Sequence, residues 1–587
     1  MTERVVVDPV TRIEGHLRIE AEVGPDGRLT DAYSSGTMVR GLELILKDRD
    51  PREAWAFAQR ICGVCTLVHG LASVRATEDA LNWEIPPNAR LMRNLMAAAQ
   101  YVHDHVMHFY HLHALDWVDV VSALKADPKA TSELAQSISG YAKSSPGYFA
   151  DAQARVKQFV ESGQLGVFAN AYWGHPEYKL PPEANLMAVA HYLEALGWQR
   201  EVVKLHALFG GKNPHPNLLC GGMATPISAD PSATAGAFDA TAVNITSLTA
   251  LRDIVRSMQD FARQVYLPDT LAVASFYKDW FARGEGVGNF MTFGDFPEDG
   301  MGDPSKWMVP AGVILDRNLS EVLPVDLNDP EQVTEDVARA WYDYRRDRPL
   351  HPYDGETKLA YDGPKPPYTQ LSVEGTYSWL KAPRWRGRPM EVGPLARLAM
   401  WLATGREDAT DAATRALRFL DLPTEAIYST MGRTAARAIE AVLLADRMEG
   451  WLDQLIANIA AGDLSVHNAA KWDPSSWPSV AKGVGFMEAP RGALAHWIVI
   501  RDRKIANYQA VVPSTWNAGP RCAAGEIGPY EAALMDRHAL ADREKPLEII
   551  RTVHSFDPCL ACAVHVAGEN GGPGVTVEVG PGGSCAV

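Results

Sequence analysis

A short cysteine motif occurs near both ends of the chain. The first copy reads RICGVC at residues 60–65, and the second reads DPCLAC at residues 557–562. Thiolate sulfur is a soft ligand that prefers nickel, copper(I), zinc or iron to magnesium or calcium. If Cys62, Cys65, Cys559 and Cys562 bind one metal centre, almost the whole chain must fold to bring them together.

The composition is that of an ordinary globular protein. Of 587 residues, 47% are apolar and 22% are charged, with a formal net charge of −16. The sequence contains no block of lysine and arginine, and binding to nucleic acid depends on clustered positive charge, so we expect no nucleic-acid partner. No apolar run reaches the roughly 18–20 residues that a membrane-spanning helix needs.

The remaining cysteines do not indicate a disulfide scaffold. The chain has seven cysteines, four of them in the two motifs, which is few for its length. We expect Cys220 and Cys522 to be small buried side chains. The N-terminus lacks the apolar segment of a signal peptide. We therefore expect a cytoplasmic protein, or one exported together with a second chain that carries the signal.

Helical periodicity dominates the pattern of apolar residues. The longest such segment, 88–124, contains no proline or glycine and predicts a long core helix. Further helices are expected from Pro51 towards Cys62 and over 185–208, 233–265, 395–404 and 434–461. Strands are expected at 5–7 and 16–23, a hairpin at 496–512, and a surface loop at 349–367. We predict a mainly α fold with peripheral β hairpins, in which a large multihelical core bundle lets the N- and C-terminal segments meet at a buried metal site.

The cysteine spacing alone leaves several uses open. A structural zinc site usually joins pairs a few tens of residues apart, and the long separation here removes that argument without excluding zinc. A redox dithiol needs only one pair, in a βαβ context. The third alternative is another soft-metal centre. The flanking residues favour the third, because His69 and His565 follow the two motifs and Arg60 and Asp557 precede the cysteines.

Together with DPVTRIEGH at residues 8–16, these motifs resemble the large subunit of nickel–iron hydrogenases, and the resemblance covers essentially the whole chain. It implies a catalytic subunit that reversibly cleaves H2 into two protons and two electrons. All four cysteines would bind nickel: Cys62 and Cys559 as terminal ligands, and Cys65 and Cys562 as bridges to an iron that carries carbon monoxide and cyanide. Position 559 is a cysteine, so the selenocysteine form is not expected.

The resemblance also implies roles around the metals. Glu14 would relay the proton beside Cys559, although a surface strand residue is the alternative for Glu14 taken alone, and Arg491 would lie over the metals as a third catalytic group. Other implied neighbours are Pro490, Pro513 and Ser514 at the diatomic ligands, Asp104 and Asp557 next to Arg491, and His69 hydrogen-bonded to a bridging sulfur.

A separate magnesium site is implied as well. Its protein ligands would be Glu43, the carbonyl of Ala510 and His565, a small set that suits an ion that keeps several waters. The alternative for Glu43 is an exposed charge. The histidine-dense segment 103–113 offers a second metal site, but we expect core histidines with satisfied hydrogen bonds there.

The resemblance implies a single domain over residues 1–565 and an extension, 566–587, that a maturation protease removes by cutting between His565 and Val566. The extension is rich in glycine and cannot build a core. The chain has no spare cysteine clusters, so electrons would leave through an iron–sulfur small subunit.

The membrane-associated uptake branch of these hydrogenases is expected. It adds a membrane cytochrome b or another electron-transfer subunit, and places the protein on the periplasmic side of the cytoplasmic membrane, exported with the small subunit; the cytoplasm is the second choice. The alternatives are a non-catalytic H2 sensor, a subunit of the complex I type, whose members have generally lost these cysteines, and a structural zinc protein.

Overall fold

The structure is a computed structural model that describes residues 3–163, 168, 171–230, 242–344, 348–364 and 370–563. Cys562 and Ala563 are described by their backbone only. The predicted magnesium ligand His565, the cleavage site at Val566 and the extension lie outside the described residues.

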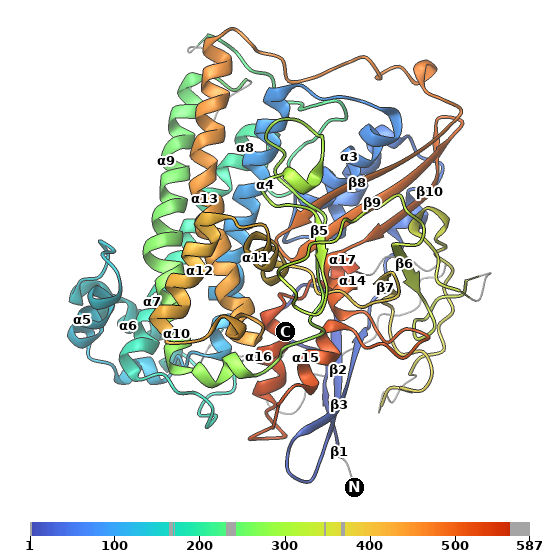
Figure 1. The fold of residues 1–587 in the computed structure, drawn as a ribbon. Coiled ribbons are helices and arrows are strands. Elements are labelled where there is room, and N and C mark those ends of the chain that lie inside the picture. Colours follow the sequence, from blue (N-terminus) through green and yellow to red (C-terminus); the bar gives the residue numbers. More distant parts are fainter. Residues whose placement is uncertain are drawn as a thin grey trace.

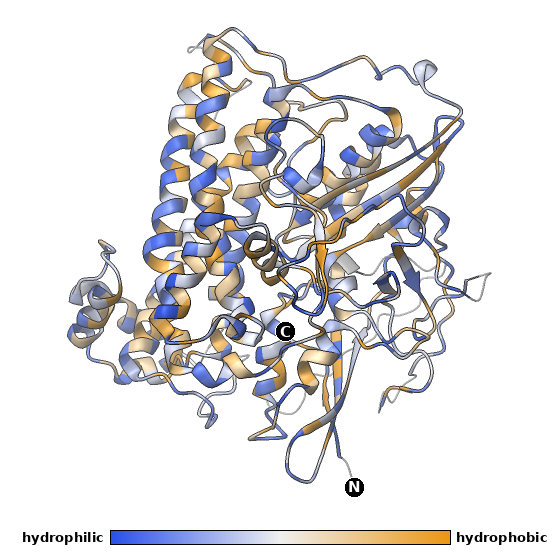
Figure 2. Ribbon diagram, in the orientation of Figure 1, coloured by the Kyte–Doolittle hydropathy of each residue, from blue (hydrophilic) through white to orange (hydrophobic). Residues whose placement is uncertain are grey.

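Long helices form one side of the molecule (Figure 1). Helix α13 (Thr430–Ala460) packs against α4 (Pro87–Met107) and α9 (Ile245–Phe261), and α7 (Pro182–Val202) packs against α4. Helix α9 buries Leu248, Leu251, Val255 and Met258, spacings that place one apolar face against the bundle. Figure 2 shows hydrophilic and hydrophobic residues alternating along this outer helix. The predicted helices over 185–208, 395–404 and 434–461 correspond to observed helices with shifted ends.

The remaining helices are shorter. Proline opens α4, α7 and several others, a position where its missing N–H breaks no helical hydrogen bond. The bounds are α1 (Leu42–Ile45), α2 (Ala54–Ala58), α3 (Val68–Leu81), α5 (Pro128–Ile138), α6 (Pro146–Glu161), α8 (Lys204–Gly210), α10 (Leu267–Phe276), α11 (Pro394–Ala403), α12 (Glu407–Leu420), α14 (Pro513–Ala518), α15 (Pro529–Met535), α16 (Leu547–Ser555) and α17 (Leu560–Ala563).

The helix predicted over 88–124 was wrong at its C-terminal end. Regular α-helix stops at Met107 and is followed by a π-helical segment, His108–His113, and a 3-10 turn, Ala114–Asp116. A π-helix adds residues to each turn, so the histidines that follow Met107 do not continue the α-helical spacing. Apolar periodicity cannot signal this change, because most of the segment stays buried.

Two three-stranded antiparallel sheets flank the bundle. One has the order β1 (Glu3–Val7), β2 (Leu17–Val23), β3 (Leu29–Gly36), and the other β10 (Lys504–Val511), β9 (Gly492–Arg501), β8 (Val480–Ala489). The predicted hairpin over 496–512 is present, but β3 and β8 were not predicted. Two small pairs join β4 (Phe290–Thr292) to β5 (Gly312–Ile314) and β6 (Val333–Asp336) to β7 (Ala382–Trp385).

Helix α3 lies directly on β8, which fixes the first cysteine motif relative to the second sheet. A Cβ added at Gly485 would lie 1.9 Å from the carbonyl oxygen of Ala72, so only glycine permits this approach. The predicted surface loop 349–367 is only partly exposed, since His351, Pro352 and Thr357 are buried. Within the described residues, no helix has the length and apolar character needed to cross a membrane.

Candidate metal centre

Three of the four motif cysteines converge in the interior. Cys62, Cys65 and Cys559 are buried, and their sulfur atoms all lie within 4.8 Å of one another. The Cys62 and Cys559 sulfurs are 3.4 Å apart although 497 positions separate them. The backbone N–H groups of Val64 and Cys65 point at Cys62 Sγ from 3.3 and 3.1 Å, and such donors stabilise a thiolate.

The fourth cysteine, Cys562, has its backbone in α17, directly after Cys559. A single side chain ties the two motifs together. The Arg40 guanidinium donates to the carbonyl of Ile61, just before Cys62, and to the carbonyl of Ala561 at 2.6 Å. The sequence analysis did not identify Arg40, because a side chain that bonds to main-chain carbonyls has no motif that marks it.

Glu14 lies beside the cysteines. Its backbone forms an isolated parallel bridge with Cys559, and its side chain is partly buried. Burial first and Cys62 second raise the pKa of the Glu14 carboxyl, against the lowering effects of Arg491 and Arg40. Gly15 has a φ of +84°, and a Cβ there would lie 2.2 Å from Ala561 N, so the close approach depends on glycine.

Arg491 lies in the turn between β8 and β9 and is 3% exposed. Its Nε donates to the carbonyl of Asp557 at 3.1 Å, and its Nη1 lies 3.5 Å from Asp104 Oδ2. Nη2 is 3.0 Å from Asp557 Oδ1 without hydrogen-bond alignment. Burial opposes the charge, but Asp557 and the Cys559 sulfur raise the pKa of Arg491 well above its usual value. The cation is therefore permanent.

The backbone that carries Arg491 is held from behind by Arg397 of α11. Arg397 donates to the carbonyls of Ala489 and Pro490 at 3.0 and 2.9 Å. It also forms buried ion pairs with Glu488, at 2.9 Å, and with Glu440 of α13. Sequence reasoning missed Arg397 and Glu440, which lie in regular helices without a motif around them.

The other predicted neighbours lie close by. Ser514, in the first turn of α14 after Pro513, accepts a hydrogen bond from the Cys559 N–H at 2.9 Å. His69 Nδ1 lies 3.1 Å from His496 Nε2, whose Nδ1 lies 2.6 Å from the Tyr508 hydroxyl. Burial lowers the pKa of His69 to about 4, so the ring is neutral at pH 7. A bond from His69 to sulfur stays a prediction.

Glu43 lies in a separate buried site. Its Oε1 accepts the Ala510 N–H at 3.1 Å, and its Oε2 accepts the Thr357 hydroxyl. A cavity of about 10 Å³ is lined by Glu43, Glu335, Tyr342, Trp379, Lys381, Ala510 and Thr515. The exposed-charge alternative for Glu43 is wrong, since the residue is 5% exposed. Thr357 was missed because it lies in the segment predicted to be surface loop.

The expectation of satisfied core histidines in the histidine-dense segment is met only in part: His105 and His108 each bond a protein group through Nε2, but their buried Nδ1 atoms have no hydrogen-bond partner among the described residues. His105 Nε2 lies 2.7 Å from Glu440, and His108 Nε2 lies 2.7 Å from the carbonyl of His554. His113 contacts Asp116, which belongs to a second buried cluster.

The donor set fits a soft metal. Three buried sulfurs within one metal's reach, with a fourth cysteine on the adjoining turn, provide thiolates and no hard oxygen ligand. The buried Arg491 Nη2 lies 3.0 Å from Asp557 Oδ1 but has no well-aligned hydrogen-bond acceptor among the described residues. A buried donor of this kind requires a partner, and an acceptor bound at the metals would supply one.

Comparisons of the sequence with known proteins identify one family. A sequence profile for nickel-dependent hydrogenases matches residues 40–565, and one described as HoxL-like matches residues 4–35. The uptake hydrogenase large subunit of Bradyrhizobium diazoefficiens is 56% identical over 97% of this chain and 96% of that protein. The hydrogenase-1 large chain of Escherichia coli K12 is 52% identical over 98% of this chain and 97% of that one.

Solved structures show the same fold. The nickel–iron–selenium hydrogenase of Desulfovibrio vulgaris Hildenborough in its reduced state matches with a TM-score of 0.74 and 33% identity, over 96% of this chain and 100% of that chain. The corresponding enzyme of Desulfomicrobium baculatum gives a TM-score of 0.72 and 34% identity, over 96% and 100%.

Proposed function

Because the chain belongs to the nickel-dependent hydrogenase family, and is the catalytic subunit of a nickel–iron hydrogenase, we propose how its own residues divide the work of splitting H2. The observation that carries the proposal is the convergence of both cysteine motifs at one buried point. The comparisons give no support to the H2-sensor or complex I alternatives.

The proposed nickel ligands are Cys62, Cys65, Cys559 and Cys562, with Cys65 and Cys562 shared with iron. When bound, the metal pair, whose iron carries carbon monoxide and cyanide, supplies the electron-poor centre at which H2 is polarised. The thiolates hold the pair in a site closed to water, and the charge of Arg491, together with the donors at Cys62, offsets their negative charge.

The proton leaves through Cys559 and Glu14. The Cys559 thiolate accepts the proton, and the carboxylate of Glu14, whose backbone pairs with that of Cys559, takes it onward towards the surface. The raised pKa of Glu14 supports this role, because a carboxyl that can hold a proton for part of the time transfers it more readily than one that is always ionised. The partial exposure of Glu14 gives the proton a way out.

Arg491 is proposed as the cationic group over the metals. Asp104 and Asp557 orient its guanidinium, and Pro490 and Pro513 provide apolar walls. Ser514 uses its oxygen to accept the Cys559 N–H, so its hydroxyl hydrogen stays available as a donor to an iron ligand. His69 would donate to a bridging sulfur, since a neutral ring has one N–H.

Glu43, the Ala510 carbonyl and His565 are proposed as magnesium ligands. Although burial opposes its charge, Glu335 raises the pKa of Lys381 well above its usual value, so two carboxylates and one ammonium group surround the cavity. The remaining negative charge favours a hard cation with water ligands.

A small subunit is the proposed electron acceptor, because Cys220 and Cys522 stand singly in the described structure. We also propose one domain over 1–565, removal of 566–587 by a protease that cuts between His565 and Val566, a membrane cytochrome b or a similar subunit as the next acceptor, and a location on the periplasmic side of the membrane. The intact mass of the native complex tests the cleavage. Cell fractionation tests the membrane subunit and the periplasmic location.

An infrared spectrum of the complex purified with its small subunit tests the centre. Bands of metal-bound carbon monoxide and cyanide that shift under H2 are the expected result. A preparation with full nickel and iron content that shows no such bands would overturn the proposed site.

A further inference from the structure

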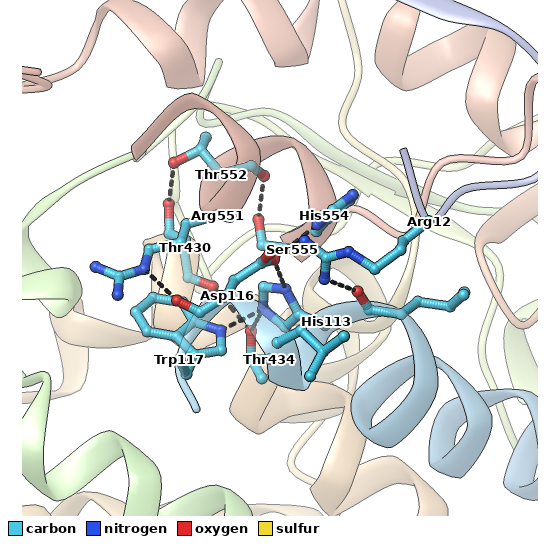
Figure 3. Close-up of polar contacts among 12 residues, drawn as sticks. Arg12, His113, Asp116, Trp117, Thr430, Thr434, Arg551, Thr552, His554 and Ser555 are labelled. Atoms are coloured by element: carbon cyan, nitrogen blue, oxygen red, sulfur yellow. Dashed lines mark hydrogen bonds and ion pairs between the residues drawn. The ribbon is translucent and has the colours of Figure 1, made fainter. Parts of the chain in front are cut away.

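A second buried cluster connects the segment that carries Glu14 to the segment that carries Cys559. It consists of Arg12, His113, Asp116 and His554, here called the Asp116 cluster. Figure 3 shows these side chains converging from three parts of the chain. His113, Asp116 and His554 are at most 1% exposed, and the function described above uses none of the four.

Asp116 is the centre of the cluster. One carboxylate oxygen, Oδ1, accepts from Arg12 at 2.5 Å. The other, Oδ2, lies 3.0 Å from His113 Nδ1 and 2.7 Å from His554 Nδ1. Burial raises the pKa of this carboxyl, but Arg12 and His554 outweigh burial and hold the pKa well below its usual value. The carboxylate is therefore charged and fully bonded.

The same atoms argue against a metal at this place, although two histidines and an aspartate are common metal ligands. His113 Nε2 accepts from the Trp117 indole N–H at 3.0 Å, and His554 Nε2 lies 2.8 Å from the Thr11 carbonyl. Every ring nitrogen and carboxylate oxygen thus has a protein partner. The Arg12 cation also occupies the side from which an ion would approach Oδ1.

The cluster holds the N-terminal segment at a point just before Glu14. Arg12 reaches Asp116 and the Leu112 carbonyl, and the Thr11 carbonyl meets His554. Arg12 has a φ of +55°, a strained conformation for a residue with a side chain, which these bonds hold in place. After Arg12, the chain reaches the bridge between Glu14 and Cys559.

The C-terminal segment is held by the same carboxylate group. His554 lies in α16, which leads into Asp557 and Cys559, and Arg551 of α16 donates to the Asp116 carbonyl at 2.8 Å. Thr552 meets Thr430 of α13 at 2.9 Å. Both segments that form the Glu14–Cys559 bridge therefore follow residues that are bound to Asp116.

We propose that Asp116 is a positioning residue, which sets the distance between the Glu14 carboxylate and the Cys559 sulfur and so controls the rate of proton transfer. The proposal rests on the proton-relay role proposed for Glu14. A displacement of about 1 Å in such a pair can cost on the order of a hundredfold in rate, and no contact with H2 or the metals is needed.

The experiment uses the complex of both subunits with Asp116→Asn, which keeps the size of the side chain and removes the charge. We expect unchanged nickel content and infrared bands, a ten- to hundredfold lower kcat for H2 oxidation, and a larger solvent deuterium isotope effect. The control is Asp119→Asn, which removes a carboxylate of the same segment that lies outside the cluster. It should match the wild type in nickel content and infrared bands, in kcat and in the isotope effect. If Asp116→Asn does not assemble, Arg12→Gln removes the outermost member of the cluster and should show the same pattern.

Glu14→Gln and the double variant Glu14→Gln/Asp116→Asn separate the two proposals. If Asp116 acts through Glu14, the double variant is no slower than Glu14→Gln alone. A fully active Glu14→Gln enzyme overturns the relay role itself. If Glu14→Gln is slow but Asp116→Asn keeps the wild-type kcat and isotope effect, only the positioning role is overturned. The same holds if Asp116→Asn has a lower kcat with an unchanged isotope effect.

Discussion

The backbone of Glu14 is paired with that of Cys559. The N–H of Leu560 donates to the Glu14 carbonyl at 2.6 Å, and the Glu14 N–H donates to the Pro558 carbonyl at 3.3 Å. Main-chain bonds thus hold a segment from the start of the chain against one from its end, and these bonds do not depend on the Glu14 side chain. Side-chain substitutions at Glu14 can therefore test its chemistry without moving the segment.

Glu14→Gln should abolish H2-dependent dye reduction, with a loss of about 10²–10⁴-fold, because an amide cannot carry the proton. Nickel content and the infrared bands should stay as in the wild type. Glu22→Gln, a substitution on strand β2 at a carboxylate paired with Arg4, is the control and should stay active. Normal turnover of Glu14→Gln would show that protons leave by another route.

Cys62→Ala should lose nickel, since it removes one of the sulfurs that lie within 4.8 Å of one another. Cys220→Ala is the matched control: this cysteine is equally buried, and burial raises the pKa of its thiol, which disfavours metal binding. Metal analysis of both complexes measures the nickel content. Equal nickel in the two variants would contradict the assignment of Cys62 as a ligand.

Arg491→Lys should lower kcat by about 10²–10³-fold, the scale for loss of a fixed donor in a dry site. Lysine keeps the charge but has no planar fork, and the guanidinium reaches both Asp557 and Asp104. Arg388→Lys, where the side chain is 49% exposed, should have no effect. Activity assays at saturating H2 check this, and a cyanide band at the wild-type frequency in Arg491→Lys would argue against a direct contact.

Glu43→Gln should remove magnesium from the purified complex and lower its melting temperature. The amide oxygen can still accept the Ala510 N–H, so the local fold should persist while the anionic ligand is lost. The exposed Glu331 provides the control Glu331→Gln. Retention of one magnesium per complex after Glu43→Gln would refute the proposed site.

His538→Gln should change how stability depends on pH. Burial lowers the pKa of His538 to about 4 in the folded chain, against about 6.5 when unfolded. The unfolded state therefore binds the proton first, and the wild type loses stability as the pH falls from 6.5 towards 4.

At pH 7.5 the variant should be less stable, because the ring bonds to Thr552 and Asp536 are gone. Below pH 6.5 the gap in unfolding free energy should narrow by about 1.4 kcal/mol per pH unit. Urea unfolding at several pH values measures it, with the exposed His16 as His16→Gln control. A gap that does not change with pH would contradict the neutral, buried state of His538.

The groups that the sequence revealed are those whose residue type carries the chemistry. Cys62, Cys65 and Cys559 were predicted to meet, and they do. Arg397, Arg40 and Thr357 were not predicted, because they bind main-chain carbonyls or carboxylates of distant segments, and their local sequence does not distinguish them from other polar residues in helices or loops.

Local sequence also determined the existence of most helices, since apolar spacing and opening prolines act over a few residues. Their ends and the extra strands β3 and β8 were decided by partners distant in the chain. Two examples are the π-helical turn after Met107 and the close packing of Gly485 on α3. The energy of each depends on the residues that pack against it from distant parts of the chain.

The sequence by itself identified the cysteines that we propose as metal ligands and the preference of such ligands for a soft metal, because this preference belongs to the thiolate group itself. Only the tertiary structure decided which residues hold those ligands in register. Asp116 and Arg397 form buried ion pairs with segments far along the chain, and such pairs are strong only where folding has excluded water.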